Sequence, residues 1–224
     1  MTRSCTATLV AMGSHIERIN DVAAQLQAEI REKYDEPEAL IYGEDVDALG
    51  GNALSTQDTA KVIALLCSAP NGVQAWSQDI DGLVQTSLNM GVAKLEKDHF
   101  SMTFAVRSSV NQEKKELLAK LRELGDFHGA TVTEVGDYPA WEYRKDSELR
   151  DTMVRVYDKC YGKKPEVVAI HAGLECGLLS EKIPGLDCVS MGPQMHDIHT
   201  SREKLDIAST ERTWNFLLEV LKNL

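Results

Sequence analysis

Two short apolar runs near the C-terminal end place the strongest constraint on how this chain can fold. EVVAIHAG at residues 166–173 and DCVSMG at residues 187–192 are largely apolar without alternation, and a short helix predicted around residues 174–180 separates them. Continuous apolar strands that alternate with helices are typical of a mainly parallel sheet that is buried on both faces. Two strands cannot form such a sheet alone, because both faces and both edges need partners. We therefore expect the other strands of this sheet to come from elsewhere.

The surrounding residues, 141–224, are accordingly predicted to be part of an α/β domain. One helix is predicted from Ser147 to Tyr161 and another from Thr210 to Leu224, with a loop at residues 193–207 before the last helix. Helices that alternate with buried strands are the arrangement of α/β folds. Loops that follow such strands are held by a rigid sheet and open to solvent, which makes them suitable places for chemistry.

Residues 1–140 follow a different pattern, which predicts a small α+β layer and gives the whole chain the fold class α/β plus α+β. Two β-runs, at residues 83–95 and 99–110, are joined at residues 96–98 and predict a hairpin. Larger apolar residues alternate with smaller or polar ones in the second run, so one face of it points inward. Helices are predicted to begin at Ser14, Thr56 and Lys114, and further strands to lie at residues 5–12, 39–43 and 130–136.

The composition excludes several classes of partner. The chain has 224 residues, 43% of them hydrophobic and 26% charged, which is ordinary for a soluble protein. A formal net charge of −11 argues against a nucleic acid or an anionic membrane surface as the main partner. No run is long enough to span a membrane, and the N-terminus has no signal-peptide pattern. The five scattered cysteines, without a CxxC motif, indicate a reduced, cytoplasmic protein.

The loop after the second apolar run carries the candidate metal ligand. His199 follows the turn at residues 192–193, and a neutral imidazole is a good zinc ligand. The alternative is an ordinary exposed loop histidine, because one histidine alone is a weak signal. His196 lies three residues earlier, but HxxH spacing suits a helix face rather than a loop. A zinc site needs three or four protein ligands, and this sequence contains no HExxH motif or cysteine cluster to complete one.

Four further residues are candidates for binding a substrate. Glu175 and His171 flank the turn at residues 172–173, where a carboxylate can either accept hydrogen bonds from helix amides or bind an ammonium group. Arg107 ends a β-run and suits bidentate binding of a carboxylate, with a solvated strand-end charge as the alternative. Asn89 interrupts an apolar run, and since strands disfavour Asn, either a bulge or a function accounts for it.

Three motifs in the C-terminal part, taken together, resemble the signature of the aminoacyl-histidine dipeptidases. They are IHAGLECGLL at residues 170–179, PGLDCVSMGP at 184–193 and IHTSREKLDI at 198–207. HAGLECG is the most specific of these runs. The resemblance covers nearly the whole chain from about Ser68 and extends more loosely to Met1. Four upstream runs match the same family in the same order, namely SAPNGV at 68–73, TSLNMGV at 86–92, VRSSV at 106–110 and GDYPAWE at 136–142.

This resemblance implies a di-zinc exopeptidase fold, in which a catalytic α/β domain carries a smaller inserted α+β lid that often dimerises. Residues 141–224 then correspond to the C-terminal part of the catalytic domain, and residues 1–140 to most of the lid. The implied reaction is metal-dependent hydrolysis of Xaa-His-type dipeptides, with two zinc ions per full-length site. The implied partners are a small dipeptide substrate and a second copy of the protein, bound through the lid.

The resemblance also assigns roles to individual residues. His199 matches the last metal ligand of the family, and Arg107 matches the lid arginine that binds the C-terminal carboxylate of the substrate. Asn89 and the loop at residues 173–175 match positions that line the substrate, with His171 beside that loop. The wider clan has a Thr-Asp pair in this loop, where the present chain has Leu and Glu, as the closer dipeptidase relatives do.

The family residues that do the catalysis have no counterpart in this sequence. They are the first metal histidine, the bridging aspartate, the general-base glutamate with its neighbouring ligand, and the lid histidine. We therefore expect an incomplete chain that is inactive by itself. Two alternatives stay open, a non-catalytic dimerisation module and a related amidohydrolase or tripeptidase of the same clan.

Overall fold

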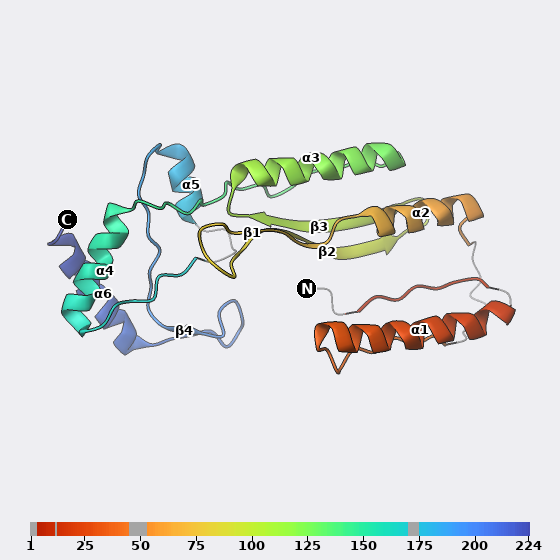
Figure 1. The fold of residues 1–224 in the computed structure, drawn as a ribbon, viewed down its shortest axis with the longest axis horizontal. Helices are drawn as coiled ribbons and strands as arrows, with labels where there is room; N and C mark the ends of the chain where they lie inside the picture. The colour runs from red at the N-terminus through yellow and green to blue at the C-terminus, as the bar shows by residue number, and fades with distance from the viewer. Residues whose placement is uncertain (1–3, 12, 45–52, 170–174) are drawn as a thin grey trace. The chain divides into compact units, whose positions relative to one another are not determined.

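The computed structural model of the chain forms two compact units, Thr2–Leu66 and Cys67–Leu224 (Figure 1). The predicted domain boundary near residue 140 lies within the second unit and stays a prediction. None of the described helices is long and apolar enough to cross a membrane. The residues that the structure describes are 4–11, 13–44, 53–169 and 175–224.

The first unit is built around helix α1 (Gly13–Tyr34), with helix α2 (Thr56–Ser68) at its C-terminal end. Both helices begin where the sequence predicts them. The chain after α1 folds back along the helix, where the backbone N–H of Ile41 donates to Gln27 Oε1 at 2.9 Å. The strands predicted at residues 5–12 and 39–43 are wrong, because neither of them forms a strand among the described residues. The backbone N–H of Ile41 is bonded to a helix side chain, whereas in a strand it would be bonded to a neighbouring strand.

The second unit contains a three-stranded antiparallel sheet in the order β1-β2-β3. Its strands are β1 (Gly72–Trp76), β2 (Val84–Leu95) and β3 (Phe100–Ser108). The predicted hairpin is therefore confirmed, and the Glu96 N–H closes its turn by donating to the His99 carbonyl at 2.8 Å. Strand β1 was not predicted, because it has only five residues and its first two belong to the turn motif SAPNGV at residues 68–73.

Helix α3 (Asn111–His128) covers one face of this sheet. Leu88 of β2 packs with Leu117 and Leu121 of the helix to form the core of the layer. From Met102 on, strand β3 alternates between half-buried and exposed residues, as the sequence predicts, and Phe104 and Val106 join this core. The helix ends at Gly129, which adopts the left-handed conformation (φ +69°) that glycine favours at helix ends.

The start of α3 is tied to the sheet and to the chain beyond the helix. Glu113, in its first turn, accepts hydrogen bonds from Gln85 at 2.5 Å and from Thr86. Asn111 makes two hydrogen bonds to the GDYPAWE motif. Its Oδ1 accepts from the backbone N–H of Ala140, and its own backbone N–H donates to the Glu142 carboxylate. These bonds hold the motif against the sheet layer.

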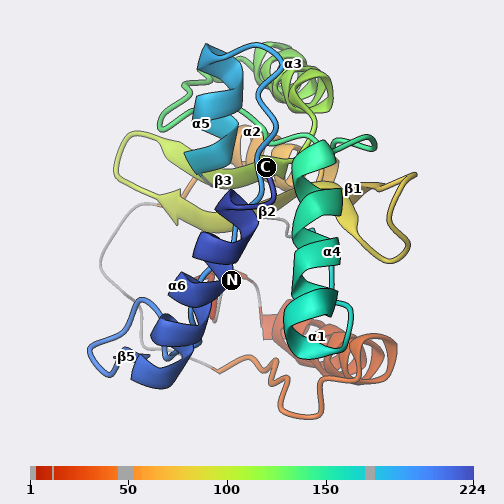
Figure 2. The same ribbon diagram turned by 90° about the vertical axis from the view of Figure 1, so that its left-hand side faces the viewer.

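The C-terminal part of this unit consists of helices packed on one another and coil segments between them. Helix α4 (Glu148–Tyr161) lies beside helix α6 (Ile207–Leu221), as both views show (Figure 2). Val156 of α4 packs with Phe216 and Val220 of α6 in a second buried core. Both helices were predicted, and Ser147 caps α4 by accepting a hydrogen bond from the Arg150 N–H at 3.0 Å.

The predicted strands of the C-terminal part are absent from the described residues. Residues 166–169 and 187–192 are coil on either side of helix α5 (Glu175–Lys182), and residues 170–173 of the first prediction lie outside the described residues. Residues 130–136 do not form their predicted strand either. A strand is defined by hydrogen bonds to a neighbouring strand, and no described segment lies in place to supply them.

A short hairpin in the loop before α6 was also not predicted. Its strands are β4 (Met195–His196) and β5 (Lys204–Leu205), which pair antiparallel. The Asp206 N–H donates to the Gln194 carbonyl at 3.0 Å and extends the pairing by one more bond. This hairpin gives the loop at residues 197–203 two fixed ends.

The buried position of Leu88 generates a stability prediction. Leu88 is 1% exposed, whereas Leu95 of the same strand is 55% exposed. We expect Leu88→Ala to lower the free energy of unfolding by about 2–5 kcal/mol, because a cavity remains where the side chain packed. The control Leu95→Ala should cost less than about 1 kcal/mol. Urea denaturation at 25 °C measures both, and equal losses would contradict the packing.

Candidate functional site

Arg107 and Asn89 lie on the same face of the sheet, opposite the face that α3 covers. In the register of β2 with β3, Ser87 pairs with Arg107, and Asn89 is two residues further along β2. Residues two apart on a strand share a face, so Asn89 and Arg107 are diagonal neighbours, for which Cα atoms are typically about 7–8 Å apart. Leu88, directly before Asn89 in the strand, points to the other face, into the core.

The surroundings of Asn89 account for the break it makes in the apolar pattern. A register shift between Met90 and Val92 begins one residue later, which is the bulge that the sequence left as one alternative. The Met90 N–H donates to Asn71 Oδ1 at 2.9 Å, so the loop before β1 is tied to this irregular point. Asn89 is half-buried and Arg107 exposed, which leaves the guanidinium in contact with solvent.

His199 lies at the exposed tip of the loop between β4 and β5. Its backbone adopts a left-handed conformation (φ +65°), and so does Asp197 (φ +51°). The loop holds these conformations with its own bonds, since the His199 N–H donates to Glu203 Oε2 at 2.9 Å and the Thr200 N–H donates to the Asp197 carbonyl at 3.2 Å. Left-handed non-glycine residues cost about 1–3 kcal/mol each and are concentrated at functional sites.

The imidazole of His199 suits a metal ligand, but the residues that the structure describes do not complete a metal site. Among the described residues its ring makes no hydrogen bond or ion pair, and the residue is exposed. No group of three or more His, Cys, Asp or Glu side chains that could hold a metal occurs in the described part of the chain. His196 lies on β4 rather than beside His199 on a helix face, so the two do not form an HxxH pair. The donor chemistry therefore fits one ligand of a zinc site that needs three or four.

Helix α5 positions the other predicted residues. Glu175 is exposed and is the first residue of α5, where its negative charge faces the positive end of the helix dipole. His171 lies outside the described residues. Gly177 is buried, and a Cβ atom there would stand 2.7 Å from the Pro139 carbonyl oxygen, so only glycine allows this approach. The second glycine of HAGLECG, Gly177, is thus a packing requirement that lets α5 lie against residues 139–140.

Cys176 is not an activated nucleophile. Burial raises the pKa of its thiol, and the neighbouring Cys188 raises it further. A thiol with a raised pKa is protonated at neutral pH, whereas catalytic cysteines need the thiolate. Cys188 also accepts a contact from Ser180 Oγ at 3.8 Å. The two cysteines therefore belong to the packing between α5 and residues 187–192.

Asp187 is a structural anchor that the sequence analysis missed. Its carboxylate accepts hydrogen bonds from Ser147 Oγ at 2.7 Å and from the Leu149 N–H at 3.0 Å. Partial burial acts to raise the pKa of Asp187, but these bonds and the nearby Arg144 and Arg150 outweigh it, so the pKa lies below its usual value. Asp187 thereby fixes the start of residues 187–192 to the first turn of α4. In the sequence, the only signal for this role is the position of Asp187 directly after the Gly185-Leu186 pair, at the start of an apolar run.

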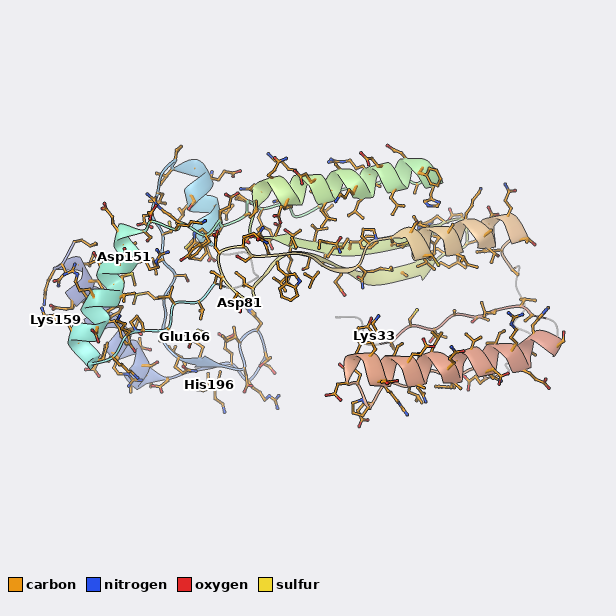
Figure 3. All side chains as sticks on the ribbon, in the orientation of Figure 1. Lys33, Asp81, Asp151, Lys159, Glu166 and His196 are labelled. Atoms are coloured by element: carbon orange, nitrogen blue, oxygen red, sulfur yellow. The ribbon has the colours of Figure 1, made fainter. Side chains whose placement is uncertain are left out.

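The four predicted site residues that the structure describes do not gather around a cavity found in this unit. The cavity has a volume of about 1230 Å³ and is lined by α4, α6 and the two coil segments at residues 165–169 and 186–192. Arg107, Asn89, Glu175 and His199 do not line it. Figure 3 shows Glu166 on one coil segment and His196 on the hairpin that presents the candidate ligand.

The sequence of residues 7–223 matches the model of peptidase family M20/M25/M40, and the chain belongs to this family. Two proteins give its relation to known enzymes. It is 29% identical over 225 residues to the cytosol non-specific dipeptidase of Escherichia coli (strain K12), covering 99% of this chain and 46% of that protein. The crystal structure of aminoacylhistidine dipeptidase from Vibrio alginolyticus matches with a TM-score of 0.83 and 29% identity, covering 93% of this chain and 43% of that one.

These comparisons confirm the resemblance to the aminoacyl-histidine dipeptidases and the predicted fold class, which includes part of an α/β catalytic domain. The aminopeptidase PepT from Bacillus cereus ATCC 10987 has the same fold at 19% identity, with a TM-score of 0.58 over 74% of this chain. The chain spans less than half the length of these relatives.

The hydrogen bonds of Asp187 generate a pH prediction. The folded-state pKa is lowered, so the ionised carboxylate stabilises the fold above about pH 4, and this contribution is lost as the pH falls through the folded value. We expect Asp187→Asn to lower the urea midpoint at pH 7 and to reduce the further loss between pH 7 and pH 3. The control Asp81→Asn removes an exposed carboxylate without a described hydrogen bond and should keep the wild-type profile. Identical profiles for Asp187→Asn and the wild type would contradict the assignment.

Proposed function

We propose that this chain is part of a metal-dependent dipeptidase that hydrolyses Xaa-His-type dipeptides. Membership of a peptidase family supports hydrolysis of a peptide bond, and two relatives are dipeptidases by name. In this proposal residues 141–224 contribute to the catalytic domain and residues 1–140 form most of a lid. Because the described residues offer one candidate zinc ligand, the chain by itself is inactive.

The observation that carries this proposal is the sheet face shared by Arg107 and Asn89. A guanidinium binds a carboxylate through two parallel hydrogen bonds, and an amide two residues along the sheet offers both a donor and an acceptor. A dipeptide has a terminal carboxylate and one amide group, which matches this pair. The opposite face of the sheet carries the core, and Arg107 is exposed on this one.

His199 supplies one zinc ligand in this proposal. The left-handed backbone at Asp197 and His199 supports it, because the loop bears the cost of a conformation that presents the imidazole to solvent. When bound, zinc polarises the scissile carbonyl and lowers the pKa of the attacking water. This chain holds the imidazole on the loop at residues 197–203, whose two ends are fixed by the pairing of β4 with β5.

Glu175 and His171 complete the substrate side of the proposal. Glu175 is exposed at the start of α5, where a carboxylate is available to the ammonium group of a dipeptide. The role of His171 rests on its position in the HAGLECG motif alone. In the intact enzyme the α5 start and the sheet face would bind opposite ends of the substrate.

Two further properties belong to the same proposal. We propose a homodimer formed through the lid, because β3 lies at an edge of the described sheet, and an open edge is able to pair with a second copy. We also propose a cytoplasmic location, which the five free cysteines and the cytosolic relative support.

Arg107 gives the direct test of the substrate proposal. In the intact enzyme that contains these residues, we expect Arg107→Ala to lower kcat/KM for Ala-His more than tenfold, because a bidentate contact to the carboxylate is lost. The matched control is Arg122→Ala, since Arg122 lies on α3, on the other side of the sheet, and pairs with Glu134. Unchanged kcat/KM for Arg107→Ala would reject the role. Comparison with N-acyl amino acids and tripeptides separates a dipeptidase from the related amidohydrolases.

Zinc content tests the role of His199 without an activity assay. We expect His199→Ala to lower the zinc bound by the intact enzyme, as measured by elemental analysis after dialysis, because one ligand of one of two sites is removed. His196→Ala, three residues away on β4, should retain the full content. A stable dimer that contains no zinc in either form would instead favour the dimerisation module.

A further inference from the structure

A buried polar network lies at the end of β3, beside the candidate carboxylate-binding residue. At its centre is Thr86 of β2, which is 2% exposed. The Thr86 hydroxyl donates to the Glu113 carboxylate and shares a hydrogen bond at 2.7 Å with Ser108 Oγ. The second carboxylate oxygen of Glu113 accepts from Gln85 Nε2 at 2.5 Å. One carboxylate therefore joins β2, β3 and the first turn of α3.

Glu113 has the position of a capping residue of α3 but bonds to the sheet instead. It is the third residue of the helix, where a glutamate commonly reaches back to the N-cap N–H in a capping box. The N-cap residue, Val110, makes no side-chain cap bond. Both carboxylate oxygens of Glu113 accept from side chains of β2. Helix capping therefore does not account for the direction of this carboxylate.

The network fixes the register pair next to Arg107. Thr86 pairs with Ser108 across the two strands, and the adjacent pair is Ser87 with Arg107. Arg107 is the last residue but one of β3, and chain ends of such elements open more readily than their centres. A slip of one residue would turn the guanidinium to the face of the core. Because the network ties Ser108 to β2 and, through Thr86, to α3, it opposes both the slip and the opening.

Binding a carboxylate through two hydrogen bonds demands this kind of support. Functional groups have to be held within about 0.5 Å of their productive geometry, and a misplacement of about 1 Å can cost about 10²-fold in rate. A buried network in which every member is satisfied specifies one geometry. Among the described residues every buried side-chain nitrogen and oxygen atom has a hydrogen-bond partner. The network therefore suits a positioning role.

We propose that Glu113 is a positioning residue for Arg107, acting through Thr86 and Ser108 to hold the guanidinium where it binds the terminal carboxylate of the substrate. The inference rests on the proposed function, which assigns that carboxylate to Arg107. Helix α3 covers the opposite face of the sheet, so Glu113 acts through the strands and not on the substrate. Loss of its carboxylate should weaken binding of the substrate carboxylate and leave the contacts to the rest of the dipeptide.

A pair of substrates tests this role in the intact enzyme that contains these residues. Ala-His has a terminal carboxylate and its C-terminal amide does not, so the ratio of their kcat/KM values reports the contact with Arg107. We expect Glu113→Gln to lower this ratio about threefold or more, because the new amide N–H₂ faces one of the two donors. The control Glu116→Gln changes an exposed glutamate of α3 that also accepts from a glutamine, and it should stay within about twofold of wild type.

Two variants of Thr86 repeat the test at the centre of the network, whether or not Glu113→Gln folds. Thr86→Val removes the hydroxyl that joins Glu113 to Ser108, so it should lower the ratio as Glu113→Gln does. Thr86→Ser keeps the hydroxyl and should retain the ratio, even if thermal unfolding shows a loss of stability. In an Arg107→Ala background, Glu113→Gln should leave the ratio unchanged, because the positioned group is gone.

The contradicting outcomes separate this inference from the proposed function. If Arg107→Ala lowers the ratio but Glu113→Gln and Thr86→Val do not, the positioning role is wrong and the carboxylate contact stands. Equal losses of kcat/KM for both substrates in Glu113→Gln mean that the network serves stability alone. Equal losses of the ratio in Thr86→Ser and Thr86→Val mean that packing, and not the hydroxyl, holds the arginine. An unchanged ratio in Arg107→Ala rejects the proposed carboxylate contact, and the positioning role with it.

Discussion

Backbone hydrogen bonding is the constraint on which the rest of this structure depends. A segment becomes a strand only where a neighbouring segment pairs with its N–H and C=O groups. Residues 72–108 satisfy this requirement within themselves, because short connections bring three antiparallel strands together. Residues 166–169 and 187–192 have the apolar composition of strands, yet they remain coil among the described residues. Backbone pairing is thus complete in the sheet of β1, β2 and β3 and missing between the described residues 166–169 and 187–192.

In the three-stranded sheet, alternate residues of each strand face opposite sides, so core residues and candidate binding residues lie on different faces. Leu88 and Val106 face α3 and make the core, whereas Asn89 and Arg107 face the other way. A shift of one residue in register would exchange the two sets, so the buried leucine also determines where the guanidinium lies. Stability and the proposed carboxylate site are therefore coupled through one pairing of β2 with β3.

The open layer is organised by polar anchors rather than by strands. Asp187 binds the capped start of α4, and Gly177 lets α5 approach the backbone at residues 139–140. The hairpin of β4 and β5 holds His199 in a left-handed conformation. These contacts tie residues 187–192 to α4 and α5 to residues 139–140, and they fix the loop that carries His199. They also explain why the specific motifs of this region combine glycine and acidic residues with apolar ones.

Local patterns in the sequence determined the long helices, the hairpin and its inward face, because these depend on neighbours a few residues apart. Family motifs pointed to Arg107, Asn89, Glu175, His171 and His199. The tertiary structure alone decided that Arg107 and Asn89 share a face and that Asp187 binds the start of a distant helix. It also decided that residues 166–169 and 187–192 stay unpaired among the described residues. Each of these depends on partners distant in sequence, or outside the described residues, and no local period encodes such a partner.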